Sequence, residues 1–168
     1  MGSDGFGDIN SQWDWAVLSE CCPALTTLMI SLGVEAHDIY GDDDESIDFA
    51  IFIWRYALRL IASASPRCRL TSITIGLYTT TSNKQWDLYE RIDRCTLHLV
   101  DWKKWDEVLG QFKDLKEVRF VDTNHRELIG FKEIEPYHTL LGPLGAIFPK
   151  YAMDHLPYLR SRGLLRFG

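Results

Sequence analysis

The chain has 168 residues, a length that fits one domain, and its composition is typical of a folded protein: 46% hydrophobic, 25% charged and 12% aromatic. A formal net charge of −6 argues against nucleic-acid binding, which depends on clustered Lys and Arg. The most apolar stretch, Ile47 to Ala64, is interrupted by Asp48, Arg55 and Arg59, so it does not predict a membrane span. We therefore expect a protein that binds neither nucleic acid nor membrane. Because no secretory signal opens the sequence, we also expect it to be cytoplasmic or nuclear.

The four cysteines show no Cys/His spacing of a metal site, so we expect reduced thiols, no metal and no cofactor. The glycine-rich residues 1–12 predict a frayed or disordered N-terminus, and residues 13–168 predict a single domain. Within it, residues Trp13 to Cys22 predict a short helix that Pro23 ends. A strand from Leu25 to Leu32 and an acidic loop at residues 35–48 follow, the loop containing Asp42-Asp43-Asp44-Glu45.

The longest predicted helix runs from Ile47 to Ala64. Its polar side chains form one narrow stripe on a helical wheel, so we expect the helix to be buried on all sides except this stripe. A strand from Leu70 to Leu77 comes next, and a weaker one is expected from Cys95 to Val100.

Asp101 is a good N-cap for a helix from Trp102 to Phe112. Its apolar arc predicts that Trp102 and Trp105 pack in the core, and its other arc, which holds Asp106, is polar. A strand from Leu115 to Val121 follows, then loops with a short helical turn in the Pro- and Gly-rich segment 122–149.

The C-terminal part, residues 150–162, predicts a helix that Pro157 kinks or restarts. Gly163 suits the position after the helix end, and residues 164–167 predict a short last strand. Three arginines at this end, Arg160, Arg162 and Arg166, are expected to cap carbonyls or to pair locally.

Three strands share one pattern, with apolar residues at the first, fourth and sixth positions. The pattern begins at Leu25, Leu70 and Leu115, a step of 45 residues each time. The weaker strand at residues 95–100 divides the second step into roughly 25 and 20 residues, which are leucine-rich-repeat lengths. Short connections and right-handed crossovers then predict an α/β fold. We expect a short leucine-rich-repeat-like solenoid of mainly parallel strands in sequential order, with the helices on its outer face. A parallel sheet with helices on both faces is the structural alternative.

Two strings in the C-terminal half suggest a family: Asp101-Trp102-x-x-Trp105-Asp106-x-x-Leu109 and Leu156-Pro157-x-Leu159-x-x-Arg162-Gly163-Leu164-Leu165. They resemble the C-terminal leucine-rich-repeat-like region of divergent F-box proteins of mushroom-forming fungi. In that family an N-terminal F-box docks onto the linker protein of a cullin-based ubiquitin ligase, and the repeats recruit a target. No Leu-Pro-x-Glu-type F-box opening precedes the repeats here. The resemblance therefore implies the substrate-recruiting part of a ligase adaptor, or a truncated F-box-like remnant with no independent role.

The outward positions of the predicted strands form the candidate partner-binding face. Stacked in order, Met29, Thr74, His98 and Arg119 make one row across it, with Glu117 two residues before Arg119. Such a mixed row can bind a protein surface, although solvated sheet positions have the same composition. The partner's identity does not follow from the sequence.

No motif of a nucleophile, a metal hydrolase or a phosphate-binding loop is present, and Asp154-His155 alone is weak support for acid–base chemistry. We therefore expect a non-enzymatic protein–protein interaction domain. The alternative is a small enzyme with a cleft near residues 122–149. An unpaired first strand would also favour self-association.

Overall fold

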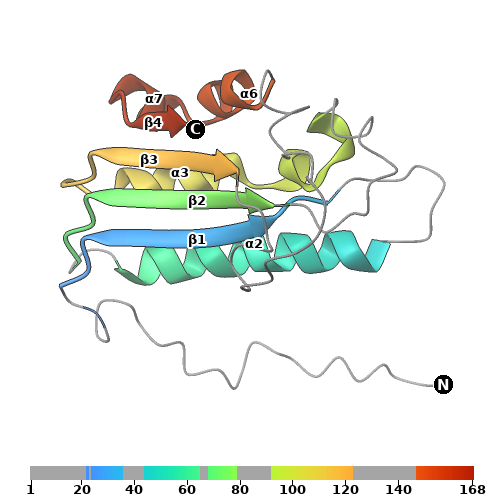
Figure 1. Ribbon diagram of the computed structural model, residues 1–168, viewed down its shortest axis with the longest axis horizontal. Coiled ribbons are helices and arrows are strands. Elements are labelled where there is room, and N and C mark those ends of the chain that lie inside the picture. Colours follow the sequence, from blue (N-terminus) through green and yellow to red (C-terminus); the bar gives the residue numbers. More distant parts are fainter. Residues whose placement is uncertain (1–21, 23, 36–43, 65–67, 79–91, 123–146) are drawn as a thin grey trace, which may run out of the picture.

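Four parallel strands form the single sheet of the computed structural model, which describes residues 22, 24–35, 44–64, 68–78, 92–122 and 147–168. Their bounds are Thr27–Gly33 (β1), Ser72–Tyr78 (β2), Glu117–Asp122 (β3) and Leu165–Phe167 (β4). Their order in the sheet is β1-β2-β3-β4, with every neighbouring pair parallel (Figure 1). This confirms an α/β fold with parallel strands in sequential order.

Residues that lie 45 positions apart in the sequence are register partners on neighbouring strands of the sheet. Leu28 lies beside Ile73, and Ile73 lies beside Val118. Two residues further on, Ile30, Ile75 and Phe120 are aligned in the same way. The inward positions of β2 and β3 are almost completely buried, whereas on the edge strand β1 Leu32 is buried and Leu28 and Ile30 are half-buried. Alternate residues of each strand therefore form a continuous apolar layer, as the alternating apolar pattern of the sequence predicts.

Four α-helices are described: Asp44–Ala64 (α2), Trp102–Gly110 (α3), Phe148–His155 (α6) and Pro157–Ser161 (α7). Two 3₁₀ helices, Ile92–Arg94 (η2) and Thr96–Leu99 (η3), precede α3. In Figure 1, α2 and α3 lie behind the sheet, and α6 and α7 pack on α3. The described helices thus cover one face of the sheet, and none of them covers the other.

Several helix ends follow the predicted chemistry. The Asp101 carboxylate accepts a hydrogen bond from the backbone N–H of Lys104 at 3.0 Å, so it caps the start of α3. At the C-terminus Pro157 begins a new helix, α7, after α6 has ended at His155. Gly163 has φ of +65°, a conformation that favours glycine, and it turns the chain from α7 into β4.

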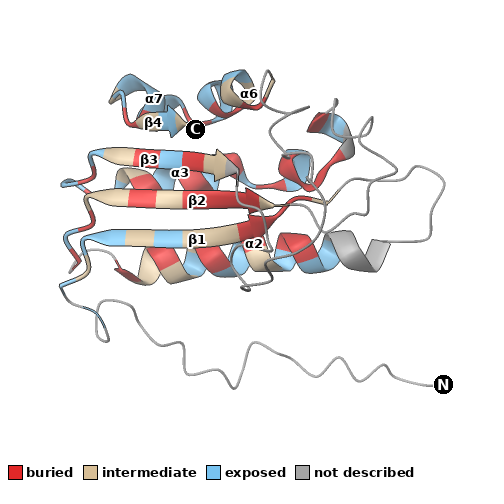
Figure 2. Ribbon diagram, viewed as in Figure 1, coloured by how far each residue is buried: buried red, intermediate tan, exposed pale blue. Residues whose placement is uncertain are grey.

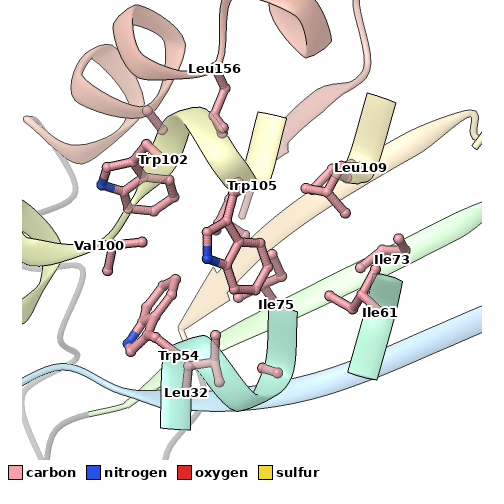
Figure 3. Close-up of a cluster of buried hydrophobic side chains, with 14 of the residues drawn as sticks. Leu32, Trp54, Ile61, Ile73, Ile75, Val100, Trp102, Trp105, Leu109 and Leu156 are labelled. Carbon is pink, nitrogen blue, oxygen red and sulfur yellow. The ribbon is translucent and has the colours of Figure 1, made fainter. Parts of the chain in front are cut away.

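The core lies between the sheet and the helices, and tryptophans of α2 and α3 form its centre (Figure 3). Trp54 meets Trp102 and Trp105 edge to face, with ring centroids 5.6 and 5.4 Å apart. Phe120 and Phe148 extend the aromatic cluster towards β4, with their centroids 5.3 Å apart. The predicted core positions of Trp102 and Trp105 are confirmed, since both are almost fully buried.

The predicted strand at residues 95–100 is wrong, because this segment contains η3. The backbone N–H groups of Lys116 and Glu117 donate to the Thr71 carbonyl, and β3 then pairs directly with β2. No place between these two strands remains for another one. The repeating unit in the described sheet is therefore about 45 residues, without the predicted division into 25 and 20.

The predicted acidic loop at residues 35–48 overlaps a helix, because α2 already begins at Asp44. The prediction that only the polar stripe of this helix is exposed is also wrong. Figure 2 shows buried and exposed positions alternating along α2, and Phe49 and Phe52 are 64% and 46% exposed. The predicted frayed N-terminus at residues 1–12 and most of the helix expected from Trp13 to Cys22 lie outside the described residues.

Candidate interaction surface

One row of side chains crosses the sheet on the face opposite the helices. The register aligns Met29 with Thr74, Thr74 with Arg119, and Arg119 with Arg166. Each lies one residue away from a core-facing position, so each projects to the other side of the sheet. Met29 is 54% exposed, both arginines are exposed and Thr74 is half-buried. We call this row the sheet-face row.

Glu117 lies next to this row and holds one of its arginines. Its carboxylate accepts a hydrogen bond from the Ser72 hydroxyl at 2.8 Å and one from Arg119 Nη2 at 3.1 Å. The Ser72 hydrogen bond and then the Arg119 hydrogen bond lower the pKa of Glu117. Glu117 therefore positions the Arg119 guanidinium, which has further N–H donors to offer.

The second arginine of the row is held by backbone carbonyls just before β4 and at its first residue. Arg166 Nη1 donates to the carbonyls of Gly163 and Leu165, at 2.9 and 2.8 Å. Two guanidinium groups on neighbouring strands thus lie at one end of the sheet-face row, and the apolar Met29 lies at the other. The arrangement suits a partner that presents a carboxylate to the arginines and an apolar side chain to Met29.

Four of the five residues predicted for the binding face lie on it: Met29, Thr74, Glu117 and Arg119. His98 does not, which corrects its predicted place between Thr74 and Arg119. It is part of η3, where its Nδ1 lies 2.7 Å from the Cys95 carbonyl oxygen, and η3 packs against α2. The error follows from the strand that residues 95–100 do not form.

Arg166 is the member of the row that sequence reasoning missed. The signal was available, because Leu165-Arg166-Phe167 has the same alternation as Val118-Arg119-Phe120. The expectation that the three C-terminal arginines cap carbonyls or pair locally is confirmed. Arg162 donates to three carbonyls after α3, and Arg160 lies 3.6 Å from Asp154. Arg166 combines carbonyl capping with exposure on the sheet face.

The part of the chain that the structure describes gives little support to a metal site, an acid–base pair or a catalytic cleft. It holds no group of three or more His, Cys, Asp or Glu side chains able to bind a metal ion. The neighbours Asp154 and His155 are engaged separately, Asp154 with Arg160 and His155 stacked on Tyr151 with ring centroids 4.0 Å apart. The cleft considered near residues 122–149 falls almost entirely outside the described residues.

None of the described helices is long and apolar enough to cross a membrane. Comparison of the chain with models of protein families, with curated proteins and with solved structures found no match.

Proposed function

We propose that the chain is a non-enzymatic protein–protein interaction domain that binds a protein partner on the open face of its sheet. The sheet-face row carries this proposal, because in-register parallel strands align an apolar side chain, a hydroxyl and two guanidinium groups on a face without a described helix. A parallel sheet usually has helices on both faces, so a face on which none of the described helices lies is available for a partner. The two arginines and Met29 are residue types enriched in protein interfaces.

The F-box resemblance suggests a more specific role, as the substrate-recruiting part of a ubiquitin-ligase adaptor built as a short solenoid. The parallel sheet in sequential order supports a stacked-repeat architecture, since each strand contacts only its neighbours. The free outer edge of β1, which pairs only with β2 among the described strands, is where further strands or a second copy would add. In this role the sheet-face row contacts the target protein.

The test is to isolate a partner with the full-length chain, identify it by mass spectrometry and measure the binary affinity by biolayer interferometry. Met29→Ala/Arg119→Ala/Arg166→Ala should weaken binding by at least about tenfold, because buried interface anchors contribute 2 kcal/mol or more each in favourable cases. The matched control is Lys103→Ala/His98→Ala, two exposed residues away from the sheet face, which should leave the affinity unchanged.

Full binding by the triple variant, with its circular dichroism spectrum unchanged, would refute the sheet face as the binding surface. Loss of binding in the control variant alone would place the partner on the helical side. Sedimentation velocity of the free chain shows whether the partner is a second copy, because self-association makes the sedimentation coefficient depend on concentration.

A further inference from the structure

A groove lies between α2 and α3, on the helical side of the molecule and therefore away from the sheet-face row. Its volume is about 310 Å³, near the lower end of the range for small-molecule sites. Its walls are mainly apolar, with Ile51, Trp54, Leu58, Val100, Trp105 and Val108. Leu99 lines it as well and is 44% exposed, so apolar surface is open to a ligand at this point. We call it the α2–α3 groove.

The polar residues that line the groove are predominantly cationic. Arg55 and Arg59 stand one turn apart on α2, and Lys104 lies opposite on α3. Lys104 already has a partner, because its Nζ is 3.3 Å from the Glu107 carboxylate. Neither arginine makes an ion pair with an acidic residue of the described chain. The acid on the rim, Asp101, is engaged in capping α3. The groove therefore offers two guanidinium groups to an anion.

A buried hydrogen-bond donor in the same wall lacks an acceptor. The indole N–H groups of Trp54 and Trp102 donate to the carbonyls of Gly33 and Leu97, at 2.9 and 2.7 Å. Trp105 is only 2% exposed, and its indole N–H makes no hydrogen bond within the described part of the chain. Figure 3 shows its nitrogen on the side of the ring that faces Val100 and Trp54, which also line the groove. Buried donors normally have a partner, so this one indicates a missing acceptor.

We propose that the α2–α3 groove binds a small amphipathic carboxylate, such as a medium-chain fatty acid. The apolar walls take the hydrocarbon body, and the carboxylate accepts hydrogen bonds from the Arg55 and Arg59 guanidinium groups and from the Trp105 N–H. The charge of the rim excludes an apolar cation, and the size of the groove excludes a large ring system. This site is independent of the sheet face and does not rest on the proposed protein partner.

The test is isothermal titration calorimetry of the full-length chain with sodium decanoate, below its micelle-forming concentration. We expect saturable binding to one site. Decanol, which lacks the charge, should bind about tenfold more weakly, and decyltrimethylammonium should not bind. Absence of decanoate binding, or binding to many sites with equal affinity for all three amphiphiles, would overturn the proposal. Displacement of decanoate by an acidic amphipathic peptide that binds much more tightly would assign the groove to a protein segment instead.

Three variants locate the ligand. Arg55→Gln/Arg59→Gln should weaken decanoate binding about tenfold, because it removes the charge-assisted hydrogen bonds. The matched control is Arg69→Gln/Arg160→Gln, which removes two exposed arginines that do not line the groove. Ala62→Leu narrows the groove with an apolar group and should reduce binding without changing charge. Trp105→Phe keeps an aromatic ring but removes the donor. If the Arg55/Arg59 and Ala62 variants both bind decanoate as tightly as the unaltered chain does, the ligand lies elsewhere and the site is refuted.

Discussion

Asp106 connects α3 to the C-terminal helix and provides a direct test of how this fold is held together. It is 7% exposed, and its two carboxylate oxygens accept hydrogen bonds from the backbone N–H groups of Tyr158 and Leu159, at 2.9 and 3.0 Å. Pro157 has no N–H, so these two donors are the first unsatisfied ones of α7. A side chain more than 50 residues away in the sequence therefore caps this helix.

We predict that Asp106→Ala lowers the free energy of unfolding by about 2–4 kcal/mol. A hydrogen bond to a charged group contributes about 1.5–3 kcal/mol, and two such bonds are lost. The Tyr158 N–H can recover part of this from water because Tyr158 is 49% exposed, whereas Leu159 is fully buried. Asp106→Asn keeps one acceptor oxygen and should cost about half as much as the alanine variant.

The assay is urea denaturation followed by circular dichroism, with comparison of midpoints at equal m-values. The expected loss corresponds to a fall in melting temperature of roughly 4–16 °C for a chain of this size. The matched control is Asp154→Ala, which removes an exposed ion pair with Arg160 and should cost under about 0.5 kcal/mol. An Asp106→Ala midpoint equal to that of the control would refute the capping role, and so would an asparagine variant no more stable than the alanine variant.

Two further predictions concern single residues. Gly163→Ala should lower the free energy of unfolding by about 1–2 kcal/mol in the same assay, because φ of +65° is strained for alanine. The added Cβ would have no atom within 4 Å, so backbone strain is the whole effect. Gly168→Ala is the control, and an unchanged midpoint for Gly163→Ala would contradict the reasoning. Burial raises the pKa of the Cys95 thiol to about 12, whereas an unfolded chain has a cysteine pKa of about 8.5. Between these values the unfolded chain releases a proton that the folded one keeps, so stability falls as pH rises, by up to about 1.4 kcal/mol per pH unit. Cys95→Ala should reduce this slope in unfolding experiments between about pH 9 and pH 10.5, and an identical slope would contradict the assignment.

The sheet could be predicted from the sequence because its determinants are local and repeat. Leu28, Ile73 and Val118 occupy equivalent positions in three similar strings, and equivalent positions in parallel neighbours become register partners. From that register four of the five predicted face residues follow. The fifth, His98, failed because Cys95-x-Leu97-x-Leu99 has an alternation that a strand or a short 3₁₀ segment satisfies equally well. A strand at residues 95–100 would have to pair with the edge of β2 that β3 already occupies, so the segment forms the 3₁₀ helix.

Features made by residues far apart in the sequence could not be predicted. Asp106 belongs to the polar arc of α3, so the helical wheel assigned it to solvent, but α7 packs over it and uses it as a cap. The α2–α3 groove has Arg55 on one helix and Lys104 on the facing one, and nothing in the sequence around either residue indicates that the two line one groove. Only the packing of the two helices on a common sheet brings them together.

The string that carries most of the family resemblance has a structural explanation at nearly every position. Leu156, Leu159 and Leu164 are buried, and Pro157 opens α7 beneath the Asp106 cap. Arg162 donates to carbonyls after α3, and the positive φ of Gly163 lets the Leu164 carbonyl accept the Val118 N–H of β3 at 2.9 Å. These contacts hold the C-terminal unit against α3 and β3, and none of them involves a binding partner. The string therefore argues for an architecture, and we look for binding specificity at exposed positions outside it, such as the sheet-face row and the rim of the α2–α3 groove.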